Sequence, residues 1–223
     1  MTALDSRALT YVDCFGQKFA KPGTYRYAIT TAAGATLGAE PRFTIEVRKA
    51  SDQATGRQHD VSIRLVDREL VADPADLVID AGDVVLWNTT ESRVPGLAIS
   101  GEARGDKFDS RRLTDLAIYT HAFGVPGHYE WRDAWGGKVG GVIEVRSPDT
   151  PDAKVADDWI RSLAQGTVVS VKGSEVKPKR VQIMTGQTIA WAIEGTRGVS
   201  ITDLDLLVPG AMGATGSGRT ASG

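Results

Sequence analysis

Cysteine, histidine and methionine are scarce in this chain. Among 223 residues there are one cysteine, three histidines and three methionines. A single cysteine excludes an intrachain disulfide and a zinc site built from several thiolates. That residue, Cys14, has no His or Lys beside it in the sequence. We therefore expect a buried small apolar side chain rather than a nucleophile.

Strong net charge, long apolar runs and leader-like segments are also missing. The formal charge is −2, which gives no electrostatic case for binding nucleic acid or an anionic membrane. No stretch approaches the ~20 apolar residues that a transmembrane helix needs. The first residues lack a basic region followed by an apolar core, so we expect a cytoplasmic protein unless the sequence is already processed. No Ser/His/Asp set, phosphate loop or nucleotide fingerprint is present, which predicts a protein that is not an enzyme.

What the chain does contain is the pattern of a turn-rich β protein. It has 25 glycines and 9 prolines, and short alternating apolar segments lie between turn signals. The segments that we expect to form strands are 25–29, 43–47, 61–66, 77–88, 94–99, 119–145, 167–171, 180–193 and 199–202. Residues 101–116 are charged and predict a loop. One helix is expected over 155–164, where apolar residues fall at helical spacing.

Two internal matches predict the architecture. Residues 181–191 match 77–87 without a gap, and Gly186 and Trp191 fall on Gly82 and Trp87. The segment 19–27 matches 123–131 through a shared Phe-x-x-Pro-Gly-x-Tyr pattern. Residues 60–146 therefore contain both halves of one unit, whereas each end of the chain contains one half.

Because a half-sandwich leaves an apolar face and an unpaired edge in water, the two end halves should pair with each other. They can do so within one chain, which their high effective concentration favours, or between neighbouring chains as a ring or filament. The predicted organisation has six parts. These are 1–48, the second half of domain A; 49–59, a linker; 60–146, the complete domain B; 147–166, a linker with the helix; 167–208, the first half of domain A; and 209–223, a flexible tail.

These motifs resemble the cupredoxin family, which consists of Greek-key β-sandwiches that usually hold a blue copper. Residues 82–88, Gly-Asp-Val-Val-Leu-Trp-Asn, are similar to the family's early motif. Residues 120–131 are similar to its later Thr-His-x-Phe and Phe-x-x-Pro-Gly-x-Tyr motifs. The resemblance implies an all-β fold of two cupredoxin-like sandwiches, one complete and one assembled from the chain ends.

The resemblance does not extend to the copper ligands, which are two His and one Cys. It would place the Cys at Asp133, the second His near Trp135 or Gly136, and the first His near Pro95 or Gly96. An axial Met would fall near Val139. In the assembled domain the Cys would fall near Ile29 and the first His near Gly198. We therefore expect no copper and no other cofactor.

Five residues remain as candidates for an interface or for the vacated pocket. His121 and His128 flank a Pro-Gly turn, and either face each other as a shallow metal site or are exposed strand residues. Asp133 points toward the vacated pocket if the alternation of its strand continues. Trp135 lies in a glycine-rich loop of the kind that hosts interfaces, and Trp159 docks the helix on this chain or on a partner.

The sequence therefore predicts a non-catalytic, copper-free structural or interaction subunit of a larger assembly. Its expected partners are other protein subunits, including copies of itself. One alternative is an accessory or electron-transfer subunit of a redox enzyme, with a non-blue metal held by His121, His128 and a carboxylate. Another is a small-molecule binder that uses the vacated pocket around Asp133.

Overall fold

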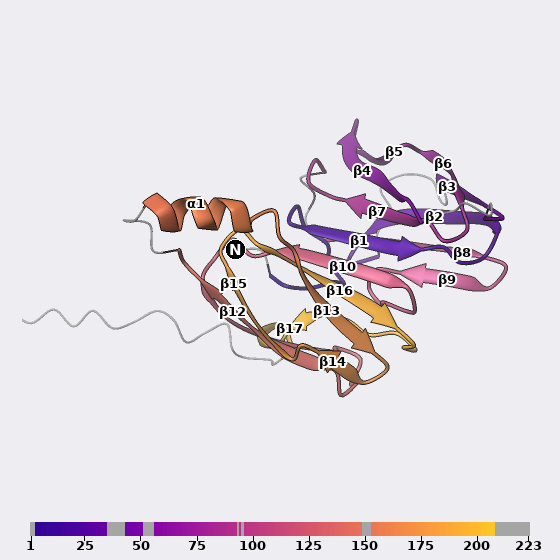
Figure 1. Ribbon diagram of the computed structural model, residues 1–223. Coiled ribbons are helices and arrows are strands. Elements are labelled where there is room, and N and C mark those ends of the chain that lie inside the picture. The colour runs from indigo at the N-terminus through magenta and orange to yellow at the C-terminus, as the bar shows by residue number, and fades with distance from the viewer. Residues whose placement is uncertain are drawn as a thin grey trace, which may run out of the picture.

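The chain forms an all-β structure of stacked sheets. The computed structural model describes residues 3–34, 43–50, 56–92, 94, 96–148 and 153–207. Figure 1 shows one long sheet that runs through the molecule, with a shorter sheet packed against each of its ends. No helix among the described residues is long and apolar enough to cross a membrane.

The bounds of the elements are as follows. The strands are β1 (Asp13–Lys18), β2 (Gly23–Thr31), β3 (Phe43–Arg48), β4 (Gln58–Val66), β5 (Glu69–Asp73), β6 (Asp76–Asp80), β7 (Val84–Asn88), β8 (Leu97–Ala103), β9 (Asp106–Asp109), β10 (Ala117–Ala122), β11 (Gly127–Arg132), β12 (Gly140–Arg146), β13 (Thr167–Lys172), β14 (Glu175–Lys177), β15 (Arg180–Met184), β16 (Thr188–Glu194) and β17 (Thr202–Asp203). The helix α1 spans Ala153–Ser162, and a single 3₁₀ turn spans Leu204–Leu206.

The strands form three sheets in the described part of the chain. The shared sheet has the order β14-β13-β16-β10-β1-β7-β4-β5. The N-terminal sheet has the order β6-β3-β2-β8-β9, and the C-terminal sheet has the order β15-β12-β11-β17. Each of the two smaller sheets therefore draws its strands from one half of the chain.

The turns that the sequence predicted lie where the strands reverse. Gly82 and Gly186 both have positive φ, 105° and 87°, which glycine adopts without steric cost. The N–H of Gly82 donates to the carbonyl of Phe19 at 2.7 Å, and that of Gly186 donates to Phe123 at 2.7 Å. The predicted match between the two motifs is thus confirmed in their backbone hydrogen bonds.

The predicted pairing between the N-terminal and C-terminal halves was wrong. The N-terminal half was expected to pair with the C-terminal half, but β2 pairs with β8 and β3 with β6. Likewise, β12 pairs with β15, so the expected complete unit 60–146 contributes strands to all three sheets. Each half is completed by the segment that follows it in the chain. Closing such a connection costs less entropy than joining segments more than a hundred residues apart.

The repeat extends further than the sequence analysis detected. The hexapeptide Asp5-Ser6-Arg7-Ala8-Leu9-Thr10 recurs as Asp109-Ser110-Arg111-Arg112-Leu113-Thr114. Through most of the chain a residue therefore has its counterpart 104 positions further on, as Asp5 and Asp109 illustrate. In both copies the Arg side chain and backbone N–H bond the Asp two residues earlier.

The two copies meet at a seam formed by β1 and β10. Their antiparallel register places Phe15 opposite Tyr119, which is its own counterpart. Cys14 pairs with Thr120, and Gly16 pairs with Ile118. This register gives the shared sheet an approximate twofold axis at the seam, in the manner of an isologous contact between two subunits.

The copies also exchange their first segments. Ser110 N donates to Ile99 O at 2.9 Å, and Ser110 thus lies beside the N-terminal sheet. Its counterpart Ser6 donates from its backbone N to Ile201 O at 2.9 Å, on the C-terminal side of the molecule. Asp203 N also donates to Leu4 O at 2.8 Å. The start of the chain therefore completes the second copy.

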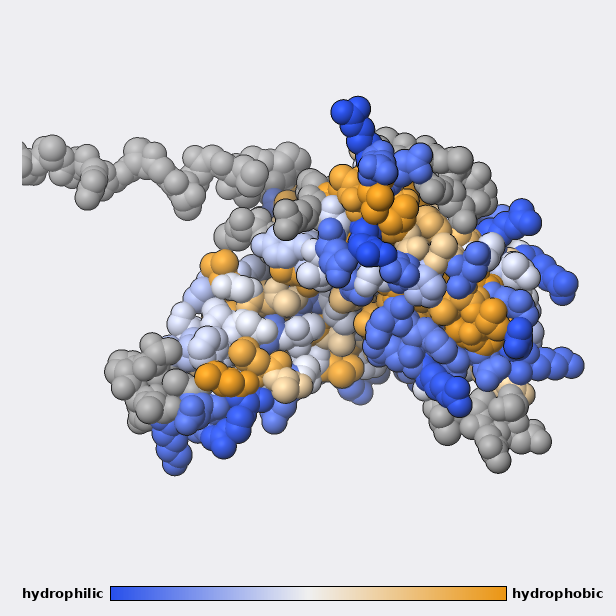
Figure 2. All heavy atoms as spheres, turned by 90° about the horizontal axis from the view of Figure 1, so that it is seen from above, coloured by the Kyte–Doolittle hydropathy of each residue, from blue (hydrophilic) through white to orange (hydrophobic). Residues whose placement is uncertain are grey.

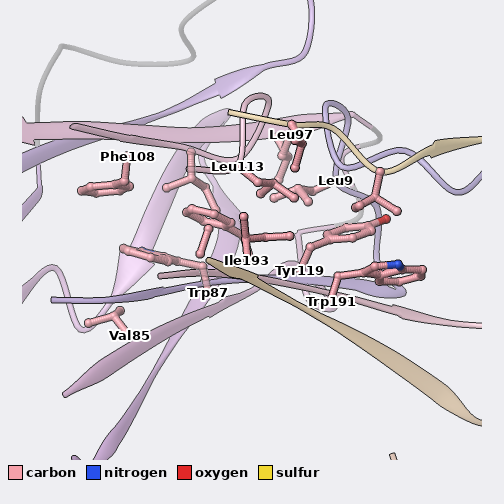
Figure 3. Close-up of a cluster of buried hydrophobic side chains, with 14 of the residues drawn as sticks. Leu9, Val85, Trp87, Leu97, Phe108, Leu113, Tyr119, Trp191 and Ile193 are labelled. Atoms are coloured by element: carbon pink, nitrogen blue, oxygen red, sulfur yellow. The ribbon is translucent and has the colours of Figure 1, made fainter. Parts of the chain in front are cut away.

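The core is continuous across the seam. Figure 3 shows Trp87 and Phe108, next to the N-terminal sheet, and Tyr119 and Trp191, on the other side of the seam, in one continuous cluster. The ring centroids of Trp87 and Phe108 are 5.4 Å apart, and those of Tyr119 and Trp191 are 5.5 Å apart. The predicted strand tryptophans, Trp87, Trp131 and Trp191, are all buried.

Residues 101–116 and the helix also differ from the prediction. Residues 101–116 were predicted as a loop, but they contain the end of β8 and all of β9. The pattern was missed because only Phe108 in β9 is buried, while its neighbours are charged. The helix was predicted correctly and lies two residues earlier than expected. The predicted tail, 209–223, lies outside the described residues.

Candidate functional site

Asp133 organises a loop at the end of β11. Its Oδ1 accepts hydrogen bonds from the backbone N–H of Trp135 at 3.2 Å and of Ser200 at 2.8 Å. Its Oδ2 accepts from the N–H of Gly137 at 2.9 Å. The Ser200 hydroxyl adds a contact at 3.3 Å. A carboxylate surrounded by backbone donors is satisfied without a bound ligand, and it ties this loop to the segment before β17.

Trp135 is held in an exposed position by this loop. Its Nε1 donates to the carbonyl of Arg111 at 3.2 Å, yet 55% of the residue is exposed. The other four tryptophans are buried or half-buried. Trp135 is thus a fixed, accessible indole, and packing among the described residues leaves more than half of it exposed.

His121 and His128 do not form the site that their spacing suggested. His128 is exposed on β11, opposite Glu144 in the C-terminal sheet. His121 lies on β10 in the shared sheet, where it is 2% exposed. Neither of the two expected arrangements holds, because one histidine is exposed and the other is buried in a different sheet.

His121 belongs instead to a buried polar cluster with Asp13 and Tyr119. Asp13 Oδ1 lies 2.7 Å from His121 Nδ1 and accepts from the Tyr119 hydroxyl at 2.7 Å. Asp13 Oδ2 accepts from Thr10 N at 2.7 Å and from Thr10 Oγ1 at 2.8 Å. Burial first, and then the charge of Asp13, raise the pKa of Tyr119 well above its usual value, so this hydroxyl stays protonated.

This cluster occurs once, although the fold repeats. The counterparts of Asp13 and His121 are Ala117 and Gln17, at the opposite end of the same β1–β10 ladder, and the counterpart of Tyr119 is Phe15, which lies directly opposite it. The fold itself therefore does not require the polar set. The cluster was not predicted from the sequence, because β1 was not recognised as a strand and its partner was not known.

A second histidine–carboxylate pair lies in the first copy. His59 Nε2 is 2.7 Å from Asp83 Oδ2, and Asp83 also accepts from the backbone N–H of Arg57 and Asp80. Burial alone would raise the pKa of Asp83, but these hydrogen bonds outweigh it and hold the pKa below its usual value. The counterpart of Asp83 is Gln187, whose amide oxygen accepts from Met184 N at 2.7 Å in the same turn.

Asp83→Gln is expected to lower the free energy of unfolding at pH 7 by about 1–3 kcal/mol, the usual range for hydrogen bonds to a charged group. A depressed folded-state pKa stabilises the fold above the unfolded pKa of ~3.9, and this stability is lost as the pH falls. The variant should therefore lose less stability than the parent between pH 5 and pH 3, as measured by urea denaturation.

Glu175→Gln is the control, since that carboxylate is fully exposed and solvent screens its pair with Lys177. An unchanged pH profile in Asp83→Gln would contradict this role.

The remaining candidates have structural roles in this chain. Trp159 Nε1 donates to Thr185 O at 2.8 Å and so docks α1 on the turn before β16. Of the two arrangements expected for Trp159, docking on the same chain is the one found. Cys14 was expected to be buried, but it is only partly buried, and burial raises the pKa of its thiol.

Metal ligands do not gather in the described part of the chain. No group of three or more His, Cys, Asp or Glu side chains there is placed to hold a metal ion. Comparisons with protein-family models, with curated proteins and with solved structures found no match to this chain.

Proposed function

We propose that this protein is a non-catalytic, copper-free structural and interaction subunit with a cupredoxin-like scaffold. The observation that carries the proposal is Trp135, an exposed indole on a loop fixed by the hydrogen bonds of Asp133. Tryptophan is among the residues that contribute most to binding energy at interfaces. An anchor that is already ordered also loses little conformational entropy when a partner binds.

The surroundings of Trp135 support a protein partner. Its indole bonds the carbonyl of Arg111, whose side chain is paired with Asp109 at 2.9 Å. Arg111 also borders a groove of about 560 Å³ on the N-terminal sheet, which Arg26 and Lys107 line as well. An aromatic anchor with arginine beside it is the composition found at the centre and rim of protein interfaces.

Other exposed apolar side chains are dispersed over the molecule. Seen from above, apolar patches are separated by hydrophilic side chains (Figure 2). Leu65 and Val66 are exposed at the β4–β5 hairpin, and Ile160 is exposed on α1. These positions provide matched controls, because each exposes an apolar side chain away from the Asp133 loop.

Trp135→Ala is expected to release the protein from its native assembly and to leave its own folding intact. Loss of an interface anchor of this kind costs 2 kcal/mol or more, a roughly thirtyfold loss of affinity. The measurement is the size of the untagged particle isolated from its own cell, by light scattering, for the parent and the variant. Ile160→Ala, which is 59% exposed before substitution, should keep the parent's particle size. A parent protein that is isolated as a single chain, or an assembly unaffected by Trp135→Ala, would refute the proposal.

A further inference from the structure

His121 lies in the wall of a cavity that has a counterpart in the other copy. The histidine cavity has a volume of about 380 Å³, and its lining includes Tyr11, His121, Phe123, Val125 and Tyr129. The volume is within the range of small-molecule sites, which begins near ~300 Å³. The cavity lies at the end of the seam where β10 leads into the turn before β11.

The counterpart, which we call the charged cavity, has about 400 Å³ and is built on the same framework. Its Phe19 and Tyr25 are the counterparts of Phe123 and Tyr129. There, Lys21 is paired with Asp106 at 2.8 Å, and the Tyr25 hydroxyl donates to the same carboxylate at 2.7 Å. The two cavities thus share their aromatic walls and differ in their polar groups.

The polar groups differ in a systematic way. Where the charged cavity has Lys18 and Lys21, the histidine cavity has Ala122 and Val125. Where the charged cavity has Gln17, whose amide donates to the carbonyls of Lys18 and Asp115, the histidine cavity has His121. The histidine cavity has therefore exchanged charge for an apolar lining with one imidazole.

The hydrogen bond to Asp13 determines which ring nitrogen of His121 can accept a hydrogen bond from a ligand. A carboxylate can only accept, so Nδ1 carries the proton that it shares with Asp13. In the neutral ring Nε2 then holds the lone pair. Nε2 accepts no hydrogen bond within the described residues, and it is not among the fully buried side-chain atoms that lack a partner. An acceptor in the cavity wall that is neither paired nor closed off is available to a ligand donor.

The lining also selects the charge of the ligand. It contains no Lys, Arg, Asp or Glu, and the nearest paired charge is the Asp13 carboxylate behind the imidazole. An anion would lose its hydration there and meet a negative charge. The His121 and Phe123 rings are 4.6 Å apart in an edge contact, and Phe123 and Tyr129 are 5.1 Å apart. Rings arranged in this way favour an aromatic guest.

We propose that the histidine cavity binds a small neutral aromatic molecule with a hydroxyl group, which donates a hydrogen bond to His121 Nε2. The ring of the ligand packs against Phe123 and Tyr129, and the hydrogen bond to Asp13 selects the imidazole tautomer whose Nε2 accepts. Phenol is the simplest probe of this class. It is neutral at pH 7 and carries both the ring and the donor.

The test uses the full ¹⁵N-labelled chain, whose three histidines give a small, assignable set of imidazole signals. Phenol should shift the His121 Nε2 signal saturably at millimolar concentration and leave the signals of His59 and His128 in place. Anisole, which has the ring without the donor, should bind roughly five- to tenfold more weakly, the effect of one hydrogen bond. Benzoate should not bind. Equal binding of phenol and anisole, binding of benzoate, or no saturable shift with phenol would overturn the proposal.

Substitution gives an independent check. His121→Gln places at this position the residue that the fold already accommodates in the charged cavity, and it should weaken phenol binding at least fivefold by calorimetry. His128→Gln, an exposed histidine on the next strand, should leave phenol affinity unchanged. Undiminished affinity in His121→Gln would overturn the proposal. The comparison of phenol with anisole on the parent chain stands even if His121→Gln does not fold.

Discussion

Asp13→Ala is expected to destabilise the folded chain by about 3–5 kcal/mol, the range for removing one partner from a buried charged pair. The carboxylate is fully buried and accepts four hydrogen bonds, from His121, Tyr119 and twice from Thr10. Its loss leaves these donors without partners, in a place that water does not reach. Urea denaturation at pH 7 measures the change.

A triple variant distinguishes the loss of these hydrogen bonds from disruption of β1. Asp13→Ala combined with Tyr119→Phe and His121→Gln gives these positions the residues of their counterparts, Ala117, Phe15 and Gln17. Replacing both partners of a hydrogen bond costs far less than removing one of them, and only the two Thr10 donors stay unpaired, so about half of the lost stability should return. A loss below ~1 kcal/mol in the single variant, or no recovery in the triple variant, would contradict the account of the cluster.

Leu4→Ala is expected to cost about 2–5 kcal/mol, as for other fully buried leucines. Leu4 is 0% exposed, and its carbonyl accepts the N–H of Asp203 at 2.8 Å. The damage should appear far along the chain, because the first segment completes the second copy. Native-state hydrogen exchange should show lost protection in β11 and β17, with β8 less affected.

Phe108→Ala is the matched control for that exchange of segments. Phe108 is the counterpart of Leu4 in the repeat and packs on Trp87. Its loss should lower protection in β2 and β8, with β17 less affected. If Leu4→Ala weakened β8 in preference to β17, the exchange of first segments would be wrong.

The features that make this chain a β protein were predictable from local patterns. Alternating residues such as Tyr25 and Tyr27 are buried as a half-buried strand requires, and the glycine turns lie at Gly82 and Gly186. The docking of Trp159 on its own chain was one of the two arrangements expected for it. These features depend on turn chemistry and on period-two burial, both of which are properties of short segments.

The pairing of the halves was not predictable from the same patterns. Ile45 can pack equally well beside Leu77 or beside Val181, because both partners are apolar residues at matching positions of the repeat. The recurrence of Asp5 to Thr10 at Asp109 to Thr114 was the signal that would have fixed the order, since it shows where each copy begins.

Both candidate sites lie where the two copies differ. Asp133 has Ile29 as its counterpart. Near Ser200 the offset is 102, as the matching bonds to Ile99 and Ile201 show, so its counterpart is Ala98. The loop that carries Trp135 is therefore held in this way in one copy only. Asp13 and His121 have Ala117 and Gln17. In a repeated fold, polar residues that one copy has and the other lacks are not needed for the fold, which favours a role in binding.

The pairing of β3 is the most direct test of this account, because it shows which segment of the chain completes each half. Methyl–methyl nuclear Overhauser contacts in the full-length protein report it. The structure predicts contacts between Ile45 and Leu77 and between Ile143 and Val181. Contacts between Ile45 and Val181, together with Ile143 and Leu77, would show that the chain ends complete each other and would contradict the account.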